Sequence, residues 1–344
     1  MTLIYFILIL GIVVLVHEFG HFIFAKKSGV YVYEFSIGMG PRLFKWTRKN
    51  DETEYSLRLL PIGGYCQLAG EEIDDDESVP KDKKFAKKTF GQKMMIAFAG
   101  IMNNFILAII LLFLIAIFNG APQNKALVGE ISEGFPAYTS GLQEGDEILT
   151  INGRDASSND LLALELQVNV GKTIDMEVER NGEVLEFTIE PKKVKIDGEE
   201  TYKYGFVIND EVKHGLWASI VYAFTKTLSL LWQMVLMVFY LCTGQLGLSS
   251  LAGPVGIFSV VGSAAAGGIW SLVSLTALIS INVGFINLLP IPAFDGGRIF
   301  FLIAEKIKGR PVDPKFENTV HAVGFFLLML LMILITYNDI LRLL

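Results

Sequence analysis

Long runs of apolar residues restrict the fold more than any other feature of this sequence. Residues 3–25 and 94–118 are each long enough to cross a bilayer as a helix, and further apolar stretches follow at 216–243, 269–291 and 319–337. Of the 344 residues, 52% are hydrophobic, which is more than is usual for a soluble protein. The sequence therefore predicts a multi-pass α-helical membrane protein with polar insertions.

Polar segments separate the apolar runs, and their charges indicate how the chain crosses the membrane. Lys26 and Lys27 follow the first run, whereas no basic residue precedes it, so we do not expect a cleaved signal peptide. Lysine is frequent again before the second run, and lysine and arginine mark the cytoplasmic flanks of membrane helices. We therefore expect the N-terminus outside, residues 28–93 in the cytoplasm and residues 122–210 outside.

Two polar segments carry strand patterns. Residues 122–210 contain short alternating stretches between glycine-rich turns, which predicts a small, mainly β domain. Residues 55–59 alternate in the same way within the cytoplasmic segment. The net charge of −7 comes with no basic stripe of the kind that binds nucleic acid. The two cysteines, Cys66 and Cys242, exclude a disulfide framework.

The first apolar run contains the motif His17-Glu18-Phe19-Gly20-His21. A helix places the two histidines on one face, where they can hold one Zn²⁺, with Glu18 beside them as a general base toward a water molecule. An ionisable side chain in mid-membrane costs about 2–3 kcal/mol or more. Several such residues in one motif require a reason, and a metal supplies one. The alternative is a polar contact between helices near the cytoplasmic end of the run.

A catalytic zinc site needs a third protein ligand and an open position. His214 closes the external domain and His321 opens the last apolar run, so both are poorly placed. Asp295 is the better candidate, because it follows an apolar helix that Pro290 and Pro292 interrupt, and broken membrane helices persist where they line a cavity. The alternative for Asp295 is a helix cap at a membrane boundary.

Topology limits how this aspartate can reach the histidines. Both parts of the site must lie late in helices that run from outside to inside, and the basic residues that follow Asp295 favour this direction. The external domain comes first, so an even number of crossings, or none, must intervene. We therefore expect residues 216–243 to be interfacial or re-entrant, unless residues 245–268 also cross.

Taken together, these residues resemble the site-2 proteases, in the bacterial branch that has one PDZ domain and acts in regulated intramembrane proteolysis. The resemblance covers essentially the whole chain. It is carried by His17-Glu18-Phe19-Gly20-His21, Ala99-Gly100-Ile101-Met102-Asn103-Asn104-Phe105, Gly253-Pro254-Val255-Gly256-Ile257, Asn287-x-x-Pro290-x-Pro292-x-x-Asp295-Gly296 and the PDZ-like segments Gly134-Phe135-Pro136-Ala137 and Gly145-Asp146-Glu147-Ile148. Ile101 and Phe294 stand where the family has proline and leucine, which bears on local helix geometry and removes no reactive group.

The resemblance implies four core transmembrane helices, a membrane-associated β-hairpin around residues 55–60 and an inserted, mainly β PDZ-like domain. The implied site residues are His17, His21 and Asp295 as zinc ligands, Glu18 as catalytic base, and Asn104 and Asn287 as supports for the substrate or the oxyanion. For either asparagine the alternative is a hydrogen bond between helices. For the PDZ-like domain the alternative is a β spacer without a peptide site.

The expected domains follow from these assignments. They are a first transmembrane helix in residues 1–27, a cytoplasmic β-hairpin region with a charged linker in 28–93, a second transmembrane helix in 94–118, the external PDZ-like domain in 122–210, interfacial or re-entrant helices in 216–268, a third core transmembrane helix with the Asp motif in 269–305, and a last transmembrane helix in 316–344.

The function that the resemblance implies is an intramembrane zinc endopeptidase of the plasma membrane, with its active site toward the cytoplasmic side. Its partners would be the lipid bilayer and single-span substrates, such as anti-sigma factors or remnant signal peptides, which an upstream site-1-type protease cuts first. No nucleic acid is expected. Two alternatives stay open: a catalytically inactive PDZ membrane scaffold, and a zinc transporter, for which more intramembrane ligands are usual.

Overall fold

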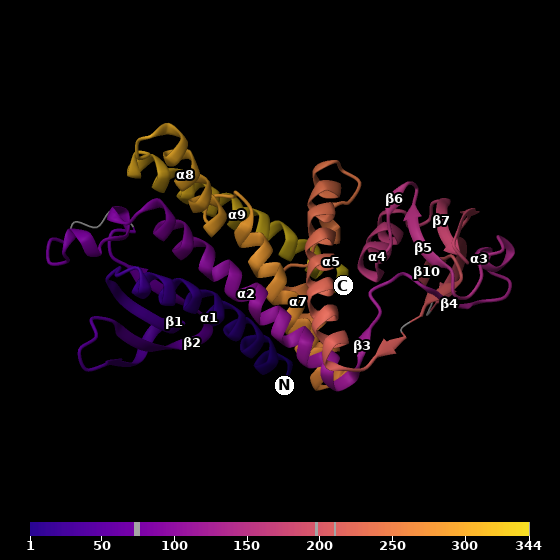
Figure 1. Ribbon diagram of the computed structural model, residues 1–344, viewed down its shortest axis with the longest axis horizontal. Helices are drawn as coiled ribbons and strands as arrows, with labels where there is room; N and C mark the ends of the chain where they lie inside the picture. The colour runs from indigo at the N-terminus through magenta and orange to yellow at the C-terminus, as the bar shows by residue number, and fades with distance from the viewer. Residues whose placement is uncertain (72–75, 197–198, 210, 344) are drawn as a thin grey trace. The chain divides into compact units, whose positions relative to one another are not determined.

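The computed structural model describes residues 1–344 with the exception of 72–75, 197–198, 210 and 344 (Figure 1). The chain forms two compact units: the first comprises Met1–Leu111 and Ser249–Leu344, and the second comprises Leu112–Leu248. Among the described residues, six helices are long and apolar enough to cross a membrane. They span Thr2–Lys27, Phe90–Asn119, Leu216–Cys242, Leu248–Ala266, Ile269–Leu288 and Lys315–Arg342.

Three helices of the first unit meet in its apolar core: α1 (Thr2–Lys27), α6 (Pro254–Ala266) and α7 (Ile269–Leu288). The buried side chains that they share are Ile9, Val13, Val261, Leu272, Leu275 and Ile279. Phe258 of α6 packs edge-on against Phe6 of α1, with ring centroids 5.7 Å apart, and the next turn of α6 faces the start of α1. Helix α6 therefore runs antiparallel to α1. A turn then leads into α7, which runs in the same direction as α1.

Helix α2 (Phe90–Asn119) lies against both α1 and α7. The Asn103 amide donates to the carbonyl oxygen of Val16 on α1 at 3.1 Å. The Ser280 hydroxyl of α7 donates to the carbonyl oxygen of Asn104 at 2.8 Å. Such hydrogen bonds stabilise a protein most where no water competes for the donor and the acceptor. They fix the position of α2 along its two neighbouring helices.

The chain breaks after α7. Residues 269–305, expected as a third core transmembrane helix with the Asp motif, contain the interruption expected at Pro290 and Pro292, because α7 ends at Leu288 and α8 (Asp295–Lys308) begins at Asp295. Pro290 and Pro292 in the connection have no N–H to continue a helical hydrogen-bond ladder. Helix α9 (Pro314–Leu343) follows, and most of its described side chains are exposed.

Strands β1 (Val32–Thr47) and β2 (Glu54–Leu68) form a hairpin that folds back on itself. Phe35 of β1 pairs with Cys66 near the end of β2 and also with Tyr55 near its beginning. The first part of β1 therefore has a partner on each edge, and the last part of β2 is an outer strand. Short 3-10 turns follow at Lys81–Lys83 and Phe85–Lys87.

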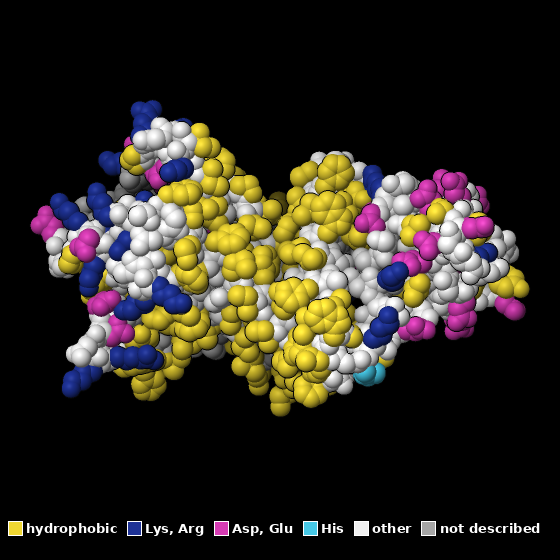
Figure 2. All heavy atoms as spheres, viewed as in Figure 1, with side chains coloured by type: hydrophobic (Ala, Val, Ile, Leu, Met, Phe, Trp, Pro, Cys, Tyr) yellow, Lys and Arg dark blue, Asp and Glu magenta, His cyan; other side chains and the backbone are white. Residues whose placement is uncertain are grey.

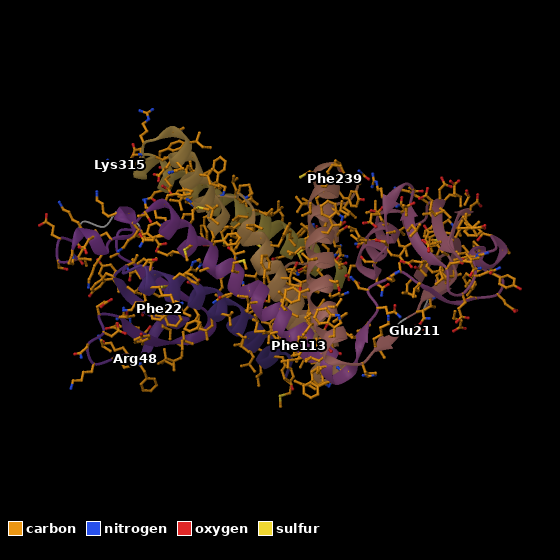
Figure 3. All side chains as sticks on the ribbon, in the orientation of Figure 1. Phe22, Arg48, Phe113, Glu211, Phe239 and Lys315 are labelled. Atoms are coloured by element: carbon orange, nitrogen blue, oxygen red, sulfur yellow. The ribbon has the colours of Figure 1, made fainter. Side chains whose placement is uncertain are left out.

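Aromatic side chains join this hairpin to α1. The rings of Phe22 and Phe35 lie 4.8 Å apart between centroids, and Figure 3 shows Phe22 on α1 beside the hairpin. Within the first unit, hydrophobic side chains gather over the helices, whereas lysine and arginine gather over the hairpin and the turn between α8 and α9 (Figure 2). This separation is typical of a protein whose helices face lipid and whose connections face water.

The second unit contains a small, mainly β domain. Its elements are β3 (Ala121–Pro122), β4 (Val128–Ile131), α3 (Pro136–Thr139), β5 (Glu147–Ile151), β6 (Arg154–Asp155), α4 (Asn159–Val168), β7 (Ile174–Arg180), β8 (Glu183–Ile189), β9 (Lys192–Ile196), β10 (Glu199–Lys203), β11 (Phe206–Ile208) and β12 (Val212–Lys213). The largest sheet has the order β6-β5-β7-β8. Its core includes Ile148, Ile151, Ile174, Met176 and Val178.

Helix α5 (Leu216–Cys242) packs its polar side on α4 of this domain. Lys226 pairs with the carboxylate of Asp160 at 2.6 Å, and Gln233 donates to the carbonyl oxygen of the same residue at 2.9 Å. Tyr240 donates to the buried carboxylate of Glu165. The opposite side of α5 carries an exposed apolar stripe, formed by Trp217, Val221, Phe224, Leu228, Trp232, Val235 and Phe239.

Candidate metal centre

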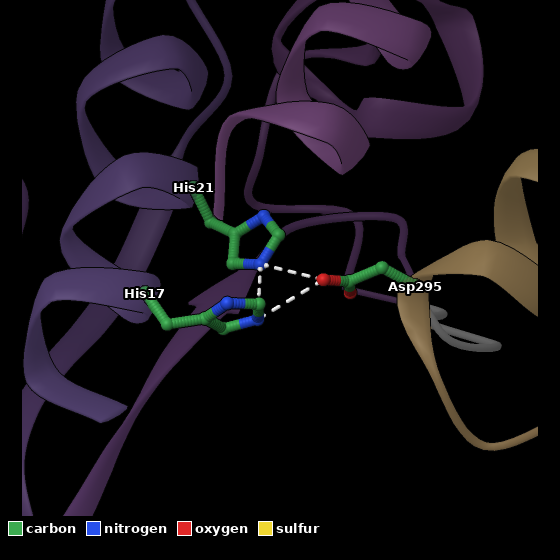
Figure 4. Close-up of side chains that lie close together, drawn as sticks. All are labelled: His17, His21 and Asp295. Atoms are coloured by element: carbon green, nitrogen blue, oxygen red, sulfur yellow. Dashed lines mark hydrogen bonds and ion pairs between the residues drawn. The ribbon is translucent and has the colours of Figure 1, made fainter. Parts of the chain in front are cut away.

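Three side chains from distant parts of the sequence meet in the first unit: His17 and His21 of α1 and Asp295 at the start of α8 (Figure 4). Nε2 of His17 lies 3.0 Å, and Nε2 of His21 lies 3.3 Å, from Oδ2 of Asp295. The two Nε2 atoms are 3.2 Å apart. His17 is buried, and the other two side chains are partly buried. Three atoms that can ligate a metal therefore converge on one point.

The chemistry of this group fits a zinc ion. Oδ2 of Asp295 is buried and has no hydrogen-bond partner in the described part of the chain, which is costly for a carboxylate unless a cation balances it. In a tetrahedral zinc site with bonds of about 2.0–2.2 Å, ligand atoms lie about 3.3–3.6 Å apart. Of the two observed separations, 3.3 Å lies at the lower end of this range and 3.0 Å is slightly shorter. Two imidazoles and one carboxylate also leave a fourth position open, as catalytic zinc requires.

Each histidine has a partner on α2 that sets its orientation. Nδ1–H of His21 donates to the carbonyl oxygen of Ile96 at 2.8 Å, which leaves Nε2 without a proton and free to bind a metal. Nδ1 of His17 lies 3.3 Å from Nδ2 of Asn104, a fully buried side chain whose Oδ1 has no partner among the described residues. With Oδ1 turned toward His17, the amide accepts Nδ1–H, and Nε2 of His17 is also left for the metal.

Two glycines let α1 and α2 approach closely at this level. A Cβ on Gly20 would lie 2.7 Å from the carbonyl carbon of Ala99. A Cβ on Gly100 would overlap both imidazoles, at 2.8 Å from Cε1 of His21 and 2.9 Å from Cε1 of His17. The histidines therefore occupy the space that a side chain at position 100 would need.

The aspartate is presented by a tight connection between α7 and α8. A Cβ on Gly296 would lie 2.5 Å from the carbonyl oxygen of Leu288, and a Cβ on Gly297 would lie 2.6 Å from that of Ile291. Only glycine fits at these two positions without a shift of the backbone. Asp295 itself lies in the first turn of α8, where the helix dipole favours a negative charge.

A cavity of about 240 Å³ opens beside the three side chains. Glu18 and Asn287 line it together with the histidines and Asp295. Glu18 faces the outer strand of the hairpin, because a Cβ on Gly64 of β2 would lie 3.8 Å from its Cγ. The cavity therefore places a carboxylate, an amide and the outer strand of the hairpin next to the candidate metal site.

Comparison with known proteins shows the family of the chain. The sequence model of peptidase family M50 matches residues 5–331. The chain belongs to peptidase family M50. It is 32% identical to the zinc metalloprotease RasP of Oceanobacillus iheyensis, with 99% of each chain covered. It is 31% identical to the regulator of sigma-W protease RasP of Bacillus subtilis and 33% identical to the probable protease eep of Enterococcus faecalis, again with 99% of each chain covered.

Membership of family M50 confirms the resemblance to the site-2 proteases and the predictions of a zinc metalloprotease and of Zn²⁺ as the cofactor. The six apolar helices and these relatives also support a membrane protein. The family match says nothing about which residues hold the metal, so the roles of individual residues rest on the geometry described above.

The structure brings together most of the site residues predicted from the sequence. His17, His21 and Asp295 converge, and Glu18 and Asn287 line the adjoining cavity. Asn104 is not among the cavity residues and lies behind His17 instead.

Sequence reasoning missed the part played by Gly100. The only sequence signal for it was its place in the block of residues 99–105, one turn before Asn104. His214, which sequence reasoning set aside, lies beside Gly120 in the second unit.

Proposed function

We propose that this M50 peptidase cuts peptide bonds within the membrane, with His17, His21 and Asp295 as zinc ligands and Glu18 as catalytic base. The observation that carries the proposal is the convergence of the three ligand atoms, at separations of 3.0 to 3.3 Å, beside a glutamate on an apolar helix. Charged and polar side chains within an apolar membrane helix cost free energy, so their presence there indicates a function.

Each residue around the cavity has its own role in the proposed reaction. When bound, zinc supplies a Lewis acid that lowers the pKa of a water molecule and polarises the scissile carbonyl. Glu18 takes the proton from that water and delivers it to the leaving amine. The Asn287 amide uses one N–H for the carbonyl oxygen of Val283, at 2.9 Å, so its second N–H is available to the developing oxyanion. Asn104 orients His17 and does not contact the substrate.

We also propose that the outer strand of the hairpin holds the substrate. A transmembrane helix hides its peptide bonds in its own hydrogen bonds, so the scissile segment must first unwind. The last part of β2 pairs with β1 along one edge and passes Glu18 at Gly64. A substrate added there as a further strand would be extended beside the base.

Replacing Glu18 with Gln tests the catalytic assignment. Purified Glu18→Gln should lose cleavage of a single-span model substrate by at least about 100-fold, the lower range of general base effects, while zinc content measured by elemental analysis stays unchanged. Glu130→Gln, an exposed position in the second unit, is the matched control and should cleave normally. Wild-type cleavage by Glu18→Gln would reject the mechanism and favour a scaffold with a structural zinc.

We propose that residues 122–210 form an external PDZ-like domain and that α5 lies on the membrane surface below it. Support for the second part comes from the polar side of α5, whose Lys226 and Gln233 bond to α4. The exposed stripe from Trp217 to Phe239 on the other side is suited to the headgroup region. With α5 at the outer surface, α1 and α7 run the same way if α6 does not cross the membrane. At 13 residues α6 is short for a crossing, and we propose that the chain dips into the bilayer before α6 and that α6 returns it to the outer side.

Labelling of single cysteines tests this arrangement. After Cys66 and Cys242 are replaced, a membrane-impermeant maleimide should label Glu130→Cys in intact cells. The same reagent should label Lys308→Cys, at the end of α8, only after the cells are opened. Labelling of Lys308→Cys in intact cells would contradict an active site toward the cytoplasm.

We propose that the substrates are single-span membrane proteins, anti-sigma factors or remnant signal peptides, already shortened outside by an upstream site-1-type protease. The support is the similarity to the regulator of sigma-W protease RasP of Bacillus subtilis. Membrane fragments that accumulate in cells carrying Glu18→Gln as the only copy, identified by mass spectrometry, would reveal the substrates. Accumulation of full-length multi-span proteins instead would contradict this substrate class.

A further inference from the structure

One residue of the connection that presents Asp295 has an unusual backbone conformation. Ala293, two positions before Asp295, has a φ of 80°. The other described non-glycine residues with a positive φ are Asn50, Asn152 and Asn181, and asparagine tolerates this region better than alanine does. A left-handed alanine persists only where its surroundings hold it.

The contact that holds Ala293 comes from α9. Its backbone N–H donates to Nδ1 of His321 at 2.9 Å. Because Nδ1 accepts this bond, the proton of the neutral ring is on Nε2, which lies 3.9 Å from the carboxylate of Glu317. The imidazole also packs on Phe301 of α8, with ring centroids 5.6 Å apart. The ring is therefore held between two helices, with its acceptor directed at the connection.

A second residue of α9 reaches the same connection. Gly324 is three positions after His321, so both lie on one face of the helix. A Cβ on Gly324 would lie 2.9 Å from the carbonyl oxygen of Pro292, the residue before Ala293. Helix α9 therefore contacts the connection at both positions.

We propose that His321 is a positioning residue of the metal centre: it holds Ala293 in its left-handed conformation and so keeps Oδ2 of Asp295 beside the two histidines. This inference rests on the proposed role of Asp295 as a zinc ligand. Among the described residues, the side chains whose ligand atoms converge are His17, His21 and Asp295, so His321 is not itself a ligand. Without this hydrogen bond Ala293 relaxes to a negative φ, the next residues rotate, and the carboxylate moves away from the metal.

Three substitutions at position 321 separate this role from simple packing. The Oδ1 atom of asparagine is attached at the same point as Nδ1 of histidine, so His321→Asn keeps an acceptor for Ala293. His321→Gln places its polar atoms near the Nε2 position instead, and His321→Leu removes the acceptor. Zinc affinity is measured by chelator competition on the purified full chain in detergent, and thermal unfolding is recorded for each variant.

The expected order of zinc affinities depends only on whether residue 321 keeps a hydrogen-bond acceptor for the Ala293 N–H. His321→Leu and His321→Gln should bind zinc about tenfold more weakly, at the lower end of the range for partners outside the ligand shell. His321→Asn should stay within about twofold of the wild type, as should the control His214→Leu in the second unit. Wild-type affinity in His321→Leu, or equal losses in the Asn and Gln variants, would overturn the proposal.

A second substitution tests the left-handed alanine directly. Glycine adopts a φ of 80° without steric cost, so Ala293→Gly makes the hydrogen bond from position 321 less necessary. His321→Leu should therefore lose less zinc affinity in an Ala293→Gly background than in the wild type. An equal loss in both backgrounds would show that His321 acts through packing and would reject the proposal.

Asp295→Ala, measured alongside, separates this inference from the function on which it rests. Unchanged zinc affinity in Asp295→Ala would overturn the ligand set and this inference together. A loss in Asp295→Ala with none in His321→Leu would overturn this inference alone.

Discussion

The two halves of the candidate metal centre are built in different ways. His17 and His21 belong to one continuous helix, and each contacts a fixed group on α2, the Asn104 amide or the Ile96 carbonyl. Asp295 instead follows a break between two helices and is more exposed than His17. The histidine half is therefore fixed by close helix packing, whereas the aspartate half depends on the conformation of a short connection.

This difference predicts different responses to mutation. Changes in the histidine half should disturb helix packing and zinc binding together, because the same atoms serve both. Changes in the aspartate half should alter zinc binding while the fold persists, because few buried contacts depend on that connection. Experiments that record zinc affinity and thermal unfolding in parallel can therefore test the comparison.

Gly100→Ala should have the largest effect. Its Cβ would overlap both imidazoles, so α1 and α2 must separate, and we expect loss of stoichiometric zinc, loss of proteolysis and destabilisation of about 1–3 kcal/mol. The matched control is Gly91→Ala on the same helix, where a Cβ would meet nothing within 4 Å. Normal zinc content in Gly100→Ala would mean that the histidine half is less tightly packed than described.

Asp295→Ala should come next, and it should separate the two readouts. Loss of a ligand should lower zinc affinity by more than about 100-fold, since loss of an outer partner alone costs 10–100-fold. The metal-free protein should unfold at the wild-type temperature or above, because the change removes a buried oxygen without a hydrogen-bond partner in the described structure. A clear fall in that temperature would show that both halves are fixed by packing.

Asn104→Ala should have a smaller effect, confined to the orientation of His17. We expect zinc affinity to fall about 10–100-fold, and Asn104→Asp should largely restore it, because a carboxylate also accepts Nδ1–H. Asn103→Ala is the neighbouring control, since that amide bonds to the Val16 carbonyl and not to a ligand. If Asn104→Ala instead kept its zinc and lost only turnover, the amide would act on the substrate.

Gly324→Ala should have the smallest effect of the four. Its Cβ would press on Pro292, but α9 is largely exposed and can shift outward to make room. We expect less than about a tenfold loss of zinc affinity, below the range of an outer partner, and little change in unfolding temperature. An effect as large as that of Gly100→Ala would remove the distinction between the two halves.

The sequence was sufficient to predict the family, the cofactor and three residues that the structure brings together. His17 and His21 could be paired because four positions in a helix fix their separation. Asp295 could be joined to them only through an argument on topology, since a great length of chain separates it from the first helix. The assignment of Glu18 as base stays a prediction, although its place on the cavity wall suits it.

Other features could not be predicted, because they depend on distances between segments that are remote in sequence. The asparagine at position 104 was recognised, but whether its amide faces substrate or His17 follows from the depth at which α2 packs. The two partners of Phe35 follow from a fold-back of the hairpin that strand alternation does not encode. By hydropathy α5 is a candidate membrane-spanning helix, whereas in the structure its polar side contacts α4.

The origin of the proposed ligands in α1 and α8 has a consequence for the synthesis of the protein. The helix with the two histidines is synthesised early, but Asp295 follows only after the whole second unit. A nascent chain therefore carries two of the three ligands through most of its synthesis, which is too few for a catalytic zinc site. Under the proposed ligand set, proteolytic activity is therefore withheld until α8 has joined α1.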